Sequence, residues 1–264
     1  MADSKHTDWT AYHYYPSKAA GTLFVVLFLI LSVIHTYRLL RTRAWFFIPL
    51  VIGTWFESLG YIGRVLSANE SPDWTIGPYV MQSTLLLVAP ALYAASIYME
   101  LGRIIHLVKA SRLAIIRVTW MTKIFVAGDL LSFLMQASGA GIMVSNSKST
   151  GENIILGGLF VQVIFFGFFL ISALVFQRRL GRSPTSESAD HSIPWQKHMF
   201  ALHFSSLLIL IRSGFRVAEY IQGSDGFLLR NEVFIYVYDG LLMLFVTVVF
   251  LAIHPGEVSC LLGQ

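Results

Sequence analysis

Seven ionisable side chains lie inside long apolar stretches of the sequence, where charged residues are rare. An ionised group in the middle of a lipid bilayer costs at least ~2.5–3 kcal/mol. Such side chains should therefore point away from lipid, pair with one another and mark a place that handles polar or charged ligands. The seven are Glu57, Arg64, Asp129, Arg212, Arg216, Glu219 and Asp239, with Glu232 at the edge of an apolar stretch.

The spacing of these residues predicts shared helix faces. Arg212, Arg216 and Glu219 follow one another at intervals of four and three, which places them on one side of an α-helix. Two further groups show helical spacing: Glu232, Tyr236 and Asp239, and the pair Glu57 and Arg64 with Tyr61 between them.

Most of these polar side chains also fall in the same half of the apolar stretches, with Glu57, Asp129 and Arg212 near the middle. We hypothesise a polar cavity that opens on the outer side and has its floor near the midplane, suited to a lipid headgroup. Buried ion pairs that only set helix register are the alternative. The candidate ligand-binding residues are Glu57, Tyr61, Arg64, Gln82, Asp129, Gln136, Gln162, Arg212, Arg216, Glu219, Glu232, Tyr236 and Asp239.

The composition predicts the elements that must position these residues. The chain of 264 residues is 55% hydrophobic and 13% charged, far from the quarter that is usual for soluble domains. The apolar runs are long enough to cross a bilayer as helices and do not alternate as barrel strands do. We predict an all-α bundle of seven transmembrane helices at 18–38, 45–67, 78–102, 119–143, 153–177, 199–222 and 232–253.

The distribution of Lys and Arg predicts the orientation. The links 38–44, 103–123 and 178–198 carry twelve of them, whereas the other side carries four. The positive-inside rule then places the N-terminus outside and the C-terminus in the cytosol. We expect an outer segment at 1–16, the seven-helix domain at 17–256, a cytosolic tail at 257–264 and a flexible link at 181–194. The sequon at Asn69 is a candidate glycosylation site on the outer side.

The sequence lacks the motifs of several other functional classes. It has no phosphate-binding loop and no glycine-rich dinucleotide turn, so we expect no nucleotide cofactor. Its basic residues flank apolar runs, which indicates membrane topology and not nucleic-acid binding. Histidines gather near the cytosolic side, and a zinc-dependent hydrolase remains an alternative. The five-residue spacing of His198 and His203 does not suit paired ligands, and we expect no acid cluster at that depth.

The polar motifs, taken in order, resemble those of a known family. They are WFESLGYIGR (55–64), APALYAASIYMELGRI (89–104), DLLSFLMQASGAG (129–141), GGLFVQVIFFGFF (157–169), RSGFRVAEYIQG (212–223), NEVFIYVYDGLLM (231–243) and HPG (254–256). This series resembles the fungal RTA-like family, also called the lipid-translocating exporter family, over about residues 15 to 256. One departure is Asn231, where the family often has a histidine.

The resemblance implies a fungal integral membrane protein, expected in the plasma membrane, that is not an enzyme. It implies export or flipping of sphingoid long-chain bases, phospholipids or related amphiphiles, and a role in resistance to toxic amphipathic compounds. Membrane lipids or amphiphilic small molecules are the expected partners. A receptor-like sensor of lipid asymmetry with an outward pocket is the alternative that the sequence leaves open.

Overall fold

The chain folds as a bundle of long helices. The computed structural model describes residues 14–71, 74–145, 148–190, 192–223 and 226–262. No strand occurs in these ranges. The long helices are α1 (Lys18–Thr42), α2 (Ile48–Asn69), α3 (Ile76–Leu107), α4 (Val118–Ser145), α5 (Lys148–Arg182), α7 (Trp195–Gln222) and α9 (Leu242–Ala252), and the short ones are α6 (Ser186–Ala189), α8 (Phe227–Arg230) and α10 (Gly256–Leu261).

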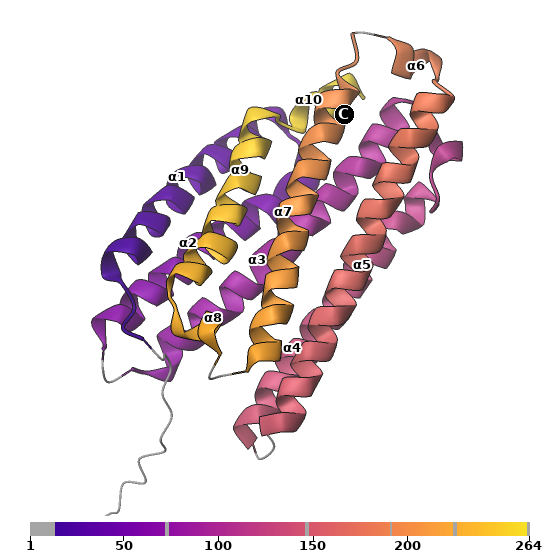
Figure 1. Cartoon of the computed structure of the whole chain (residues 1–264). Coiled ribbons are helices and arrows are strands. Elements are labelled where there is room, and N and C mark those ends of the chain that lie inside the picture. Colours follow the sequence, from indigo (N-terminus) through magenta and orange to yellow (C-terminus); the bar gives the residue numbers. More distant parts are fainter. Residues whose placement is uncertain (1–13, 72–73, 146–147, 191, 224–225, 263–264) are drawn as a thin grey trace, which may run out of the picture.

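The long helices form a ring in which chain neighbours are mostly neighbours in space (Figure 1). Helix α1 packs on α2, α2 on α3, α3 on α4 and α4 on α5, and the ring closes from α5 through α7 and α9 back to α1. Helices α3 and α7 also contact each other across the ring. This contact makes α3 and α7 the two helices best placed to carry a site in the interior.

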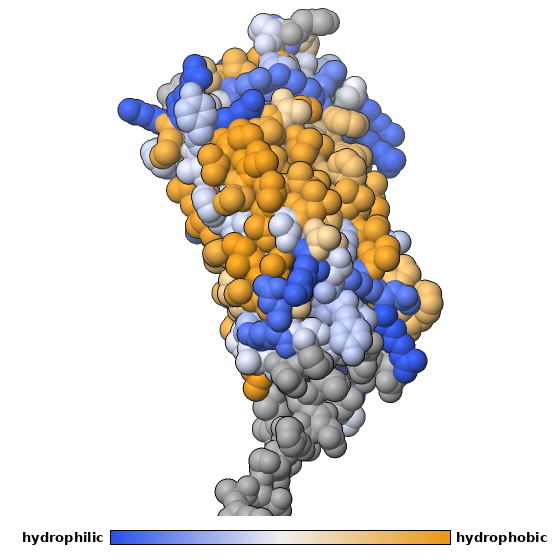
Figure 2. Space-filling model, turned by 90° about the vertical axis from the view of Figure 1, so that its left-hand side faces the viewer, coloured by the Kyte–Doolittle hydropathy of each residue, from blue (hydrophilic) through white to orange (hydrophobic). Residues whose placement is uncertain are grey.

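Seven helical segments of the described residues are long and apolar enough to cross a membrane, as the sequence predicted. Each overlaps one predicted span, and most extend beyond it by several residues at one end or both. On the face that Figure 2 shows, a band of apolar side chains lies between two more polar ends. The predicted seven-helix class is therefore confirmed.

One end of the bundle carries the Lys-rich and Arg-rich links together with α6 and α10, and we call it the basic end (Figure 1). The expected flexible link at 181–194 contains the short helix α6, which Thr185 caps by accepting a hydrogen bond from the Ser188 amide at 3.1 Å. The Lys109 ammonium pairs with Glu187 at 2.7 Å and holds α6 against the neighbouring link. This ion pair and the hydrogen bond from Ser186 lower the pKa of Glu187 to about 2.

Residues 256–261, at the start of the predicted cytosolic tail, are helical. They form α10, which packs against α3 and α1, and Val258 of this helix is fully buried. The packing brings Glu257 to the basic end of the bundle beside α7. A sequence of only six helical residues after a proline gives no hydropathy signal strong enough to predict this docking.

Close packing between α2 and α3 depends on Gly53. A Cβ atom at this position would lie 2.6 Å from the Tyr93 ring and 3.1 Å from the Ala89 carbonyl oxygen. We expect Gly53→Ala to destabilise the protein by about 1–3 kcal/mol, because the Tyr93 ring must shift. Thermal unfolding in detergent measures this. Gly167→Ala is the matched control, since an added Cβ there meets nothing within 4 Å, and an equal loss in both variants would contradict the packing argument.

Candidate functional site

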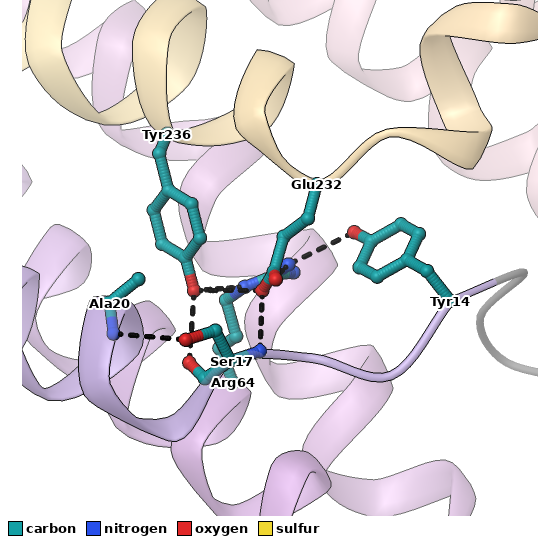
Figure 3. Close-up of polar contacts among 6 residues, drawn as sticks. All are labelled: Tyr14, Ser17, Ala20, Arg64, Glu232 and Tyr236. Atoms are coloured by element: carbon teal, nitrogen blue, oxygen red, sulfur yellow. Dashed lines mark hydrogen bonds and ion pairs between the residues drawn. The ribbon is translucent and has the colours of Figure 1, made fainter.

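The first polar cluster lies at the end opposite the basic end and joins α2, the start of the last span and the segment before α1 (Figure 3). Arg64 is fully buried, and its guanidinium donates to Glu232 at 2.7 Å and to the Tyr236 hydroxyl at 2.9 Å. Glu232 also accepts from the Ser17 amide at 2.8 Å. We call these residues, with Tyr14, the outer cluster.

Tyr14 places the N-terminal segment over this cluster. Its hydroxyl accepts a hydrogen bond from Arg64 at 2.9 Å, and the guanidinium lies 5.6 Å from the Tyr14 ring centre. Burial raises the pKa of Tyr14, so the hydroxyl stays neutral at physiological pH. No sequence pattern singles out Tyr14, because it precedes α1 and its partner Arg64 lies fifty residues away on α2.

An aromatic stack separates the outer cluster from the interior. The rings of Phe24, Tyr61 and Tyr236 lie 5.1–6.1 Å apart and nearly parallel, and Phe28 stacks on Tyr61 at 5.7 Å. Tyr61 is fully buried. Aromatic contacts of this kind contribute roughly 0.5–1.5 kcal/mol each beyond their buried area. The stack forms an apolar layer between the Arg64–Glu232 ion pair and the more deeply buried Arg212–Asp239 ion pair.

The second polar cluster lies deeper, between α3, α7 and the last span. The Arg212 guanidinium pairs with Asp239 at 3.0 Å, and both side chains are at least 96% buried. Arg216 lies 3.8 Å from the other Asp239 oxygen and pairs with Glu219 at 2.8 Å. We call Arg212, Arg216, Glu219 and Asp239, together with Glu57, the central cluster.

A proline on α3 explains one contact of Arg212. Pro90 has no backbone N–H, so the carbonyl of Leu86, four residues earlier, loses its donor within the helix. Arg212 donates to this carbonyl at 2.8 Å. The proline therefore creates the acceptor that anchors the buried guanidinium on α3, and α3 and α7 are joined at the level of the central cluster.

The central cluster includes buried polar groups that lack a protein partner. Glu57 is 1% exposed and lies within electrostatic range of Arg212 and Asp239. Among the described residues, its Oε2 atom has no hydrogen-bond partner, nor do the hydroxyls of Tyr61 and Tyr93. Both hydroxyls lie within electrostatic range of Glu57. A buried polar atom without a partner is costly, so these three atoms need a polar group that their described neighbours do not supply.

A π-helical stretch, Ile235–Leu241, sets the direction of the last two acids. The wider helix turn lets Tyr236 donate to Glu232 at 3.1 Å in the outer cluster while Asp239 faces Arg212. Gly240 fits this stretch against α1 and α2, because a Cβ there would be 2.6 Å from both Phe24 and the Tyr61 hydroxyl. Single π-helical turns occur often at functional sites.

Two of the remaining candidates, Asp129 and Gln136, form hydrogen bonds with residues outside both clusters. Asp129 on α4 accepts from the buried Tyr98 hydroxyl at 2.9 Å, and no ion pair joins it to a basic residue within the described ranges. Gln136 donates to Ser132 at 2.8 Å within α4, and the Ser132 hydroxyl donates to the Gly158 carbonyl on α5 at 2.7 Å. The other two, Gln82 on α3 and Gln162 on α5, are buried and half-buried. Within the described residues, Asp129 and Glu57 form no ion pair, although buried charges were expected to pair.

The sequence reasoning missed Glu100. This glutamate on α3 is fully buried and lies 3.4 Å from the His198 ring, whose other nitrogen lies 3.3 Å from Glu257. Two acids therefore lie beside one histidine at this depth, and the sequence analysis identified neither of them. Across the part of the chain that the structure describes, no three His, Cys, Asp or Glu residues are arranged to hold a metal ion. The hydrolase alternative gains no support from this group.

Glycosylation of Asn69 stays a prediction. Asn69 is exposed and is the last residue of α2, at the end opposite the basic end. An exposed helix end on that side is compatible with modification if this end faces the lumen during synthesis.

Comparison with known proteins adds a family. The sequence profile described as "RTA1 like protein" matches residues 50–260. This range includes Glu57, Arg64, Arg212, Glu232 and Asp239, and it leaves out the whole of α1. No solved structure matches the chain.

Several curated fungal proteins are similar over most of their length. The "Protoporphyrin uptake protein 1" of Saccharomyces cerevisiae is 41% identical, covering 90% of each chain. The "Probable lipid transporter atnI" of Emericella nidulans is 31% identical over 93% of this chain and 67% of its own. The "Sphingoid long-chain base transporter RSB1" of S. cerevisiae is 27% identical over 91% of this chain and 72% of its own. With the profile match over most of its length, the chain belongs to the RTA1-like protein family.

Proposed function

We propose that this protein is a transporter that moves lipids or related amphiphiles across the membrane. Relatives named as a lipid transporter and a sphingoid long-chain base transporter support this role. The observation that carries the proposal is the central cluster, where one Glu57 oxygen and the hydroxyls of Tyr61 and Tyr93 have no partner among the described residues, beside a buried Arg212–Asp239 pair. A headgroup entering there would satisfy these atoms while its tail stays in lipid.

The chemistry of the cluster favours charged headgroups. Glu57 and Asp239 would accept hydrogen bonds from the ammonium of a sphingoid long-chain base. Arg212 and Arg216 would hold a phosphate or keep the acids in place. We propose the plasma membrane as the location, with the basic end in the cytosol, and a contribution to resistance against toxic amphipathic compounds.

The test is transport in proteoliposomes. Purified protein is reconstituted, and the movement of a labelled sphingoid long-chain base between leaflets is followed against protein-free vesicles. A rate raised well above these vesicles supports transport. Saturable binding with no movement would instead support the receptor-like alternative and overturn this proposal.

The substitution Glu57→Gln is expected to lower transport of the cationic base by about tenfold or more. The amide keeps the size of the side chain but removes the negative charge, and tenfold corresponds to ~1.4 kcal/mol, the scale of a charge-assisted hydrogen bond. Folding stability is expected to stay unchanged, because Glu57 forms no ion pair in the structure's described ranges. Glu70→Gln is the control, since Glu70 bonds Thr75 near the protein surface. An equal loss in this control would contradict a role for Glu57.

A second candidate function is uptake of an anionic amphiphile. A relative at 41% identity is named for protoporphyrin uptake, and two arginines in the central cluster suit carboxylate groups. The same vesicles, given a porphyrin dicarboxylate on either side, distinguish the two candidates. Inward porphyrin movement that Glu57→Gln leaves intact would favour uptake over export of a cation.

A further inference from the structure

A second set of buried titratable groups lies at the basic end, where neither cluster of the candidate site reaches. Glu100 on α3 and His198 on α7 are both fully buried, and Glu100 Oε1 lies 3.4 Å from His198 Nδ1. Within the described residues, neither oxygen of Glu100 has a hydrogen-bond partner of good geometry. A carboxylate sealed in this way needs a proton, either on itself or on the imidazole beside it.

His198 has an acid at each of its ring nitrogens. Its Nε2 atom lies 3.3 Å from Glu257 Oε2 on α10, and the Glu257 side chain is 47% exposed. A neutral imidazole has one N–H and can donate to only one of the two carboxylates, whereas an imidazolium donates to both. Binding one proton is therefore favourable for the group of Glu100, His198 and Glu257. The three side chains also form a row from the half-exposed Glu257 to the buried Glu100.

Other charges near His198 set its surroundings. Lys197 forms an ion pair with Glu257 at the surface. His254 lies within electrostatic range of His198, and Arg38 lies within range of His254. His254 also accepts a hydrogen bond from the Gly256 amide at 2.9 Å, which holds the start of α10 in place. With Lys197 balancing Glu257, a single added proton makes the pair of Glu100 and His198 electrically neutral.

From this geometry we propose that Glu100 and His198 form a proton-binding site that exchanges with the solution at the basic end through Glu257. In the exchange step, the Glu257 carboxyl group passes a proton to His198 Nε2. The imidazole releases a proton from Nδ1 to a Glu100 oxygen, and the reverse sequence returns it. Imidazole supports this step because its two nitrogens give up and take up protons near neutral pH.

The position of the site links it to the rest of the molecule. Glu100 and His198 join α3 and α7, the same two helices that the contact of Arg212 with the Leu86 carbonyl joins at the central cluster. A proton at this site therefore acts on the helix pair that carries the headgroup site. This coupling to transport rests on the proposed function, whereas proton binding by itself does not.

Infrared difference spectroscopy on purified protein in lipid nanodiscs tests the site directly. Changing the buffer from alkaline to acidic should produce a carbonyl-stretch band of a protonated carboxylic acid or bands of an imidazolium. Glu100→Gln should remove the carboxylic band, and His198→Gln should remove the imidazolium bands. Asp129→Asn, a buried acid on another helix, is the matched control, because it can remove only its own carboxyl signal and should leave the bands assigned to Glu100 and His198 unchanged.

The rate of proton uptake tests the route. After a pH jump reported by an indicator dye, Glu257→Gln should slow uptake severalfold while the final spectrum matches that of the unmodified protein. Because Glu257 is half-exposed, this variant keeps the test available even if Glu100→Gln does not fold. An unchanged rate of proton uptake in Glu257→Gln would overturn the proposal. So would a carboxylic-acid band that persists in Glu100→Gln together with imidazolium bands that persist in His198→Gln. Proteoliposomes that move no lipid would refute the proposed function and leave these spectra as an independent result.

Discussion

Replacing Arg212 with leucine is expected to destabilise the protein by about 3–5 kcal/mol and to abolish transport. The substitution leaves the buried Asp239 carboxylate without its 3.0 Å partner, and removing one member of a buried ion pair has an effect of this size. The Leu86 carbonyl loses its donor as well. Arg216, at 3.8 Å from Asp239, compensates only in part. Thermal unfolding in detergent and the long-chain-base assay measure the two effects.

The double variant Arg212→Leu with Asp239→Leu distinguishes a ligand site from a scaffold. Replacing both members of a buried pair with apolar residues is often neutral or stabilising, so most of the lost stability should return. Transport should stay absent, because the charges that meet a headgroup are gone. A double variant that folds and transports normally would show that the pair serves only to set helix register.

Replacing Arg64 with methionine is expected to cost about 3–5 kcal/mol and to release the segment before α1. Arg64 is fully buried and holds Glu232, Tyr236 and Tyr14 together. Without it the Glu232 charge is left near the protein interior, and the Ser17 amide, which donates to Glu232, loses a fixed acceptor. Hydrogen exchange around the start of α1 and limited proteolysis measure the release.

Tyr14→Phe is the matched control for this experiment. It keeps the aromatic ring near the guanidinium and removes one hydrogen bond, so the expected cost is about 0.5–1.5 kcal/mol. The start of α1 should stay protected, since Glu232 still holds the Ser17 amide. Equal protection in Arg64→Met and the unmodified protein would contradict the role given to Arg64.

The seven-helix class follows from hydropathy, because a bilayer demands long apolar helices whatever their neighbours are. Burial of the charged residues follows from the same cost of exposing them to lipid. All of the candidate residues are indeed at least partly buried, as that cost requires. The helix starts and ends were less predictable, since several helices continue into the polar regions where hydropathy gives no signal.

The sequence could not predict which charges meet, because helical spacing describes one helix at a time. Glu57 and Arg64 share a helix and were expected to act together, but Arg64 joins Glu232, 168 residues away, while Glu57 lies near Arg212 and Asp239. The aromatic rings of Phe24, Tyr61 and Tyr236 separate the two groups.

Two further features required the tertiary structure. Tyr236 and Asp239 lie in a π-helical stretch, whose turns contain more residues than the α-helical turns that their spacing predicted. Glu100 is a single acid near the end of an apolar run, a position that is typical of a residue at the membrane interface. The packing of α10 and α7 against α3 makes it a buried partner of His198. Local sequence therefore determined which side chains must avoid lipid, whereas packing between distant helices decided which of them lie together, since pairing energy depends on three-dimensional distance.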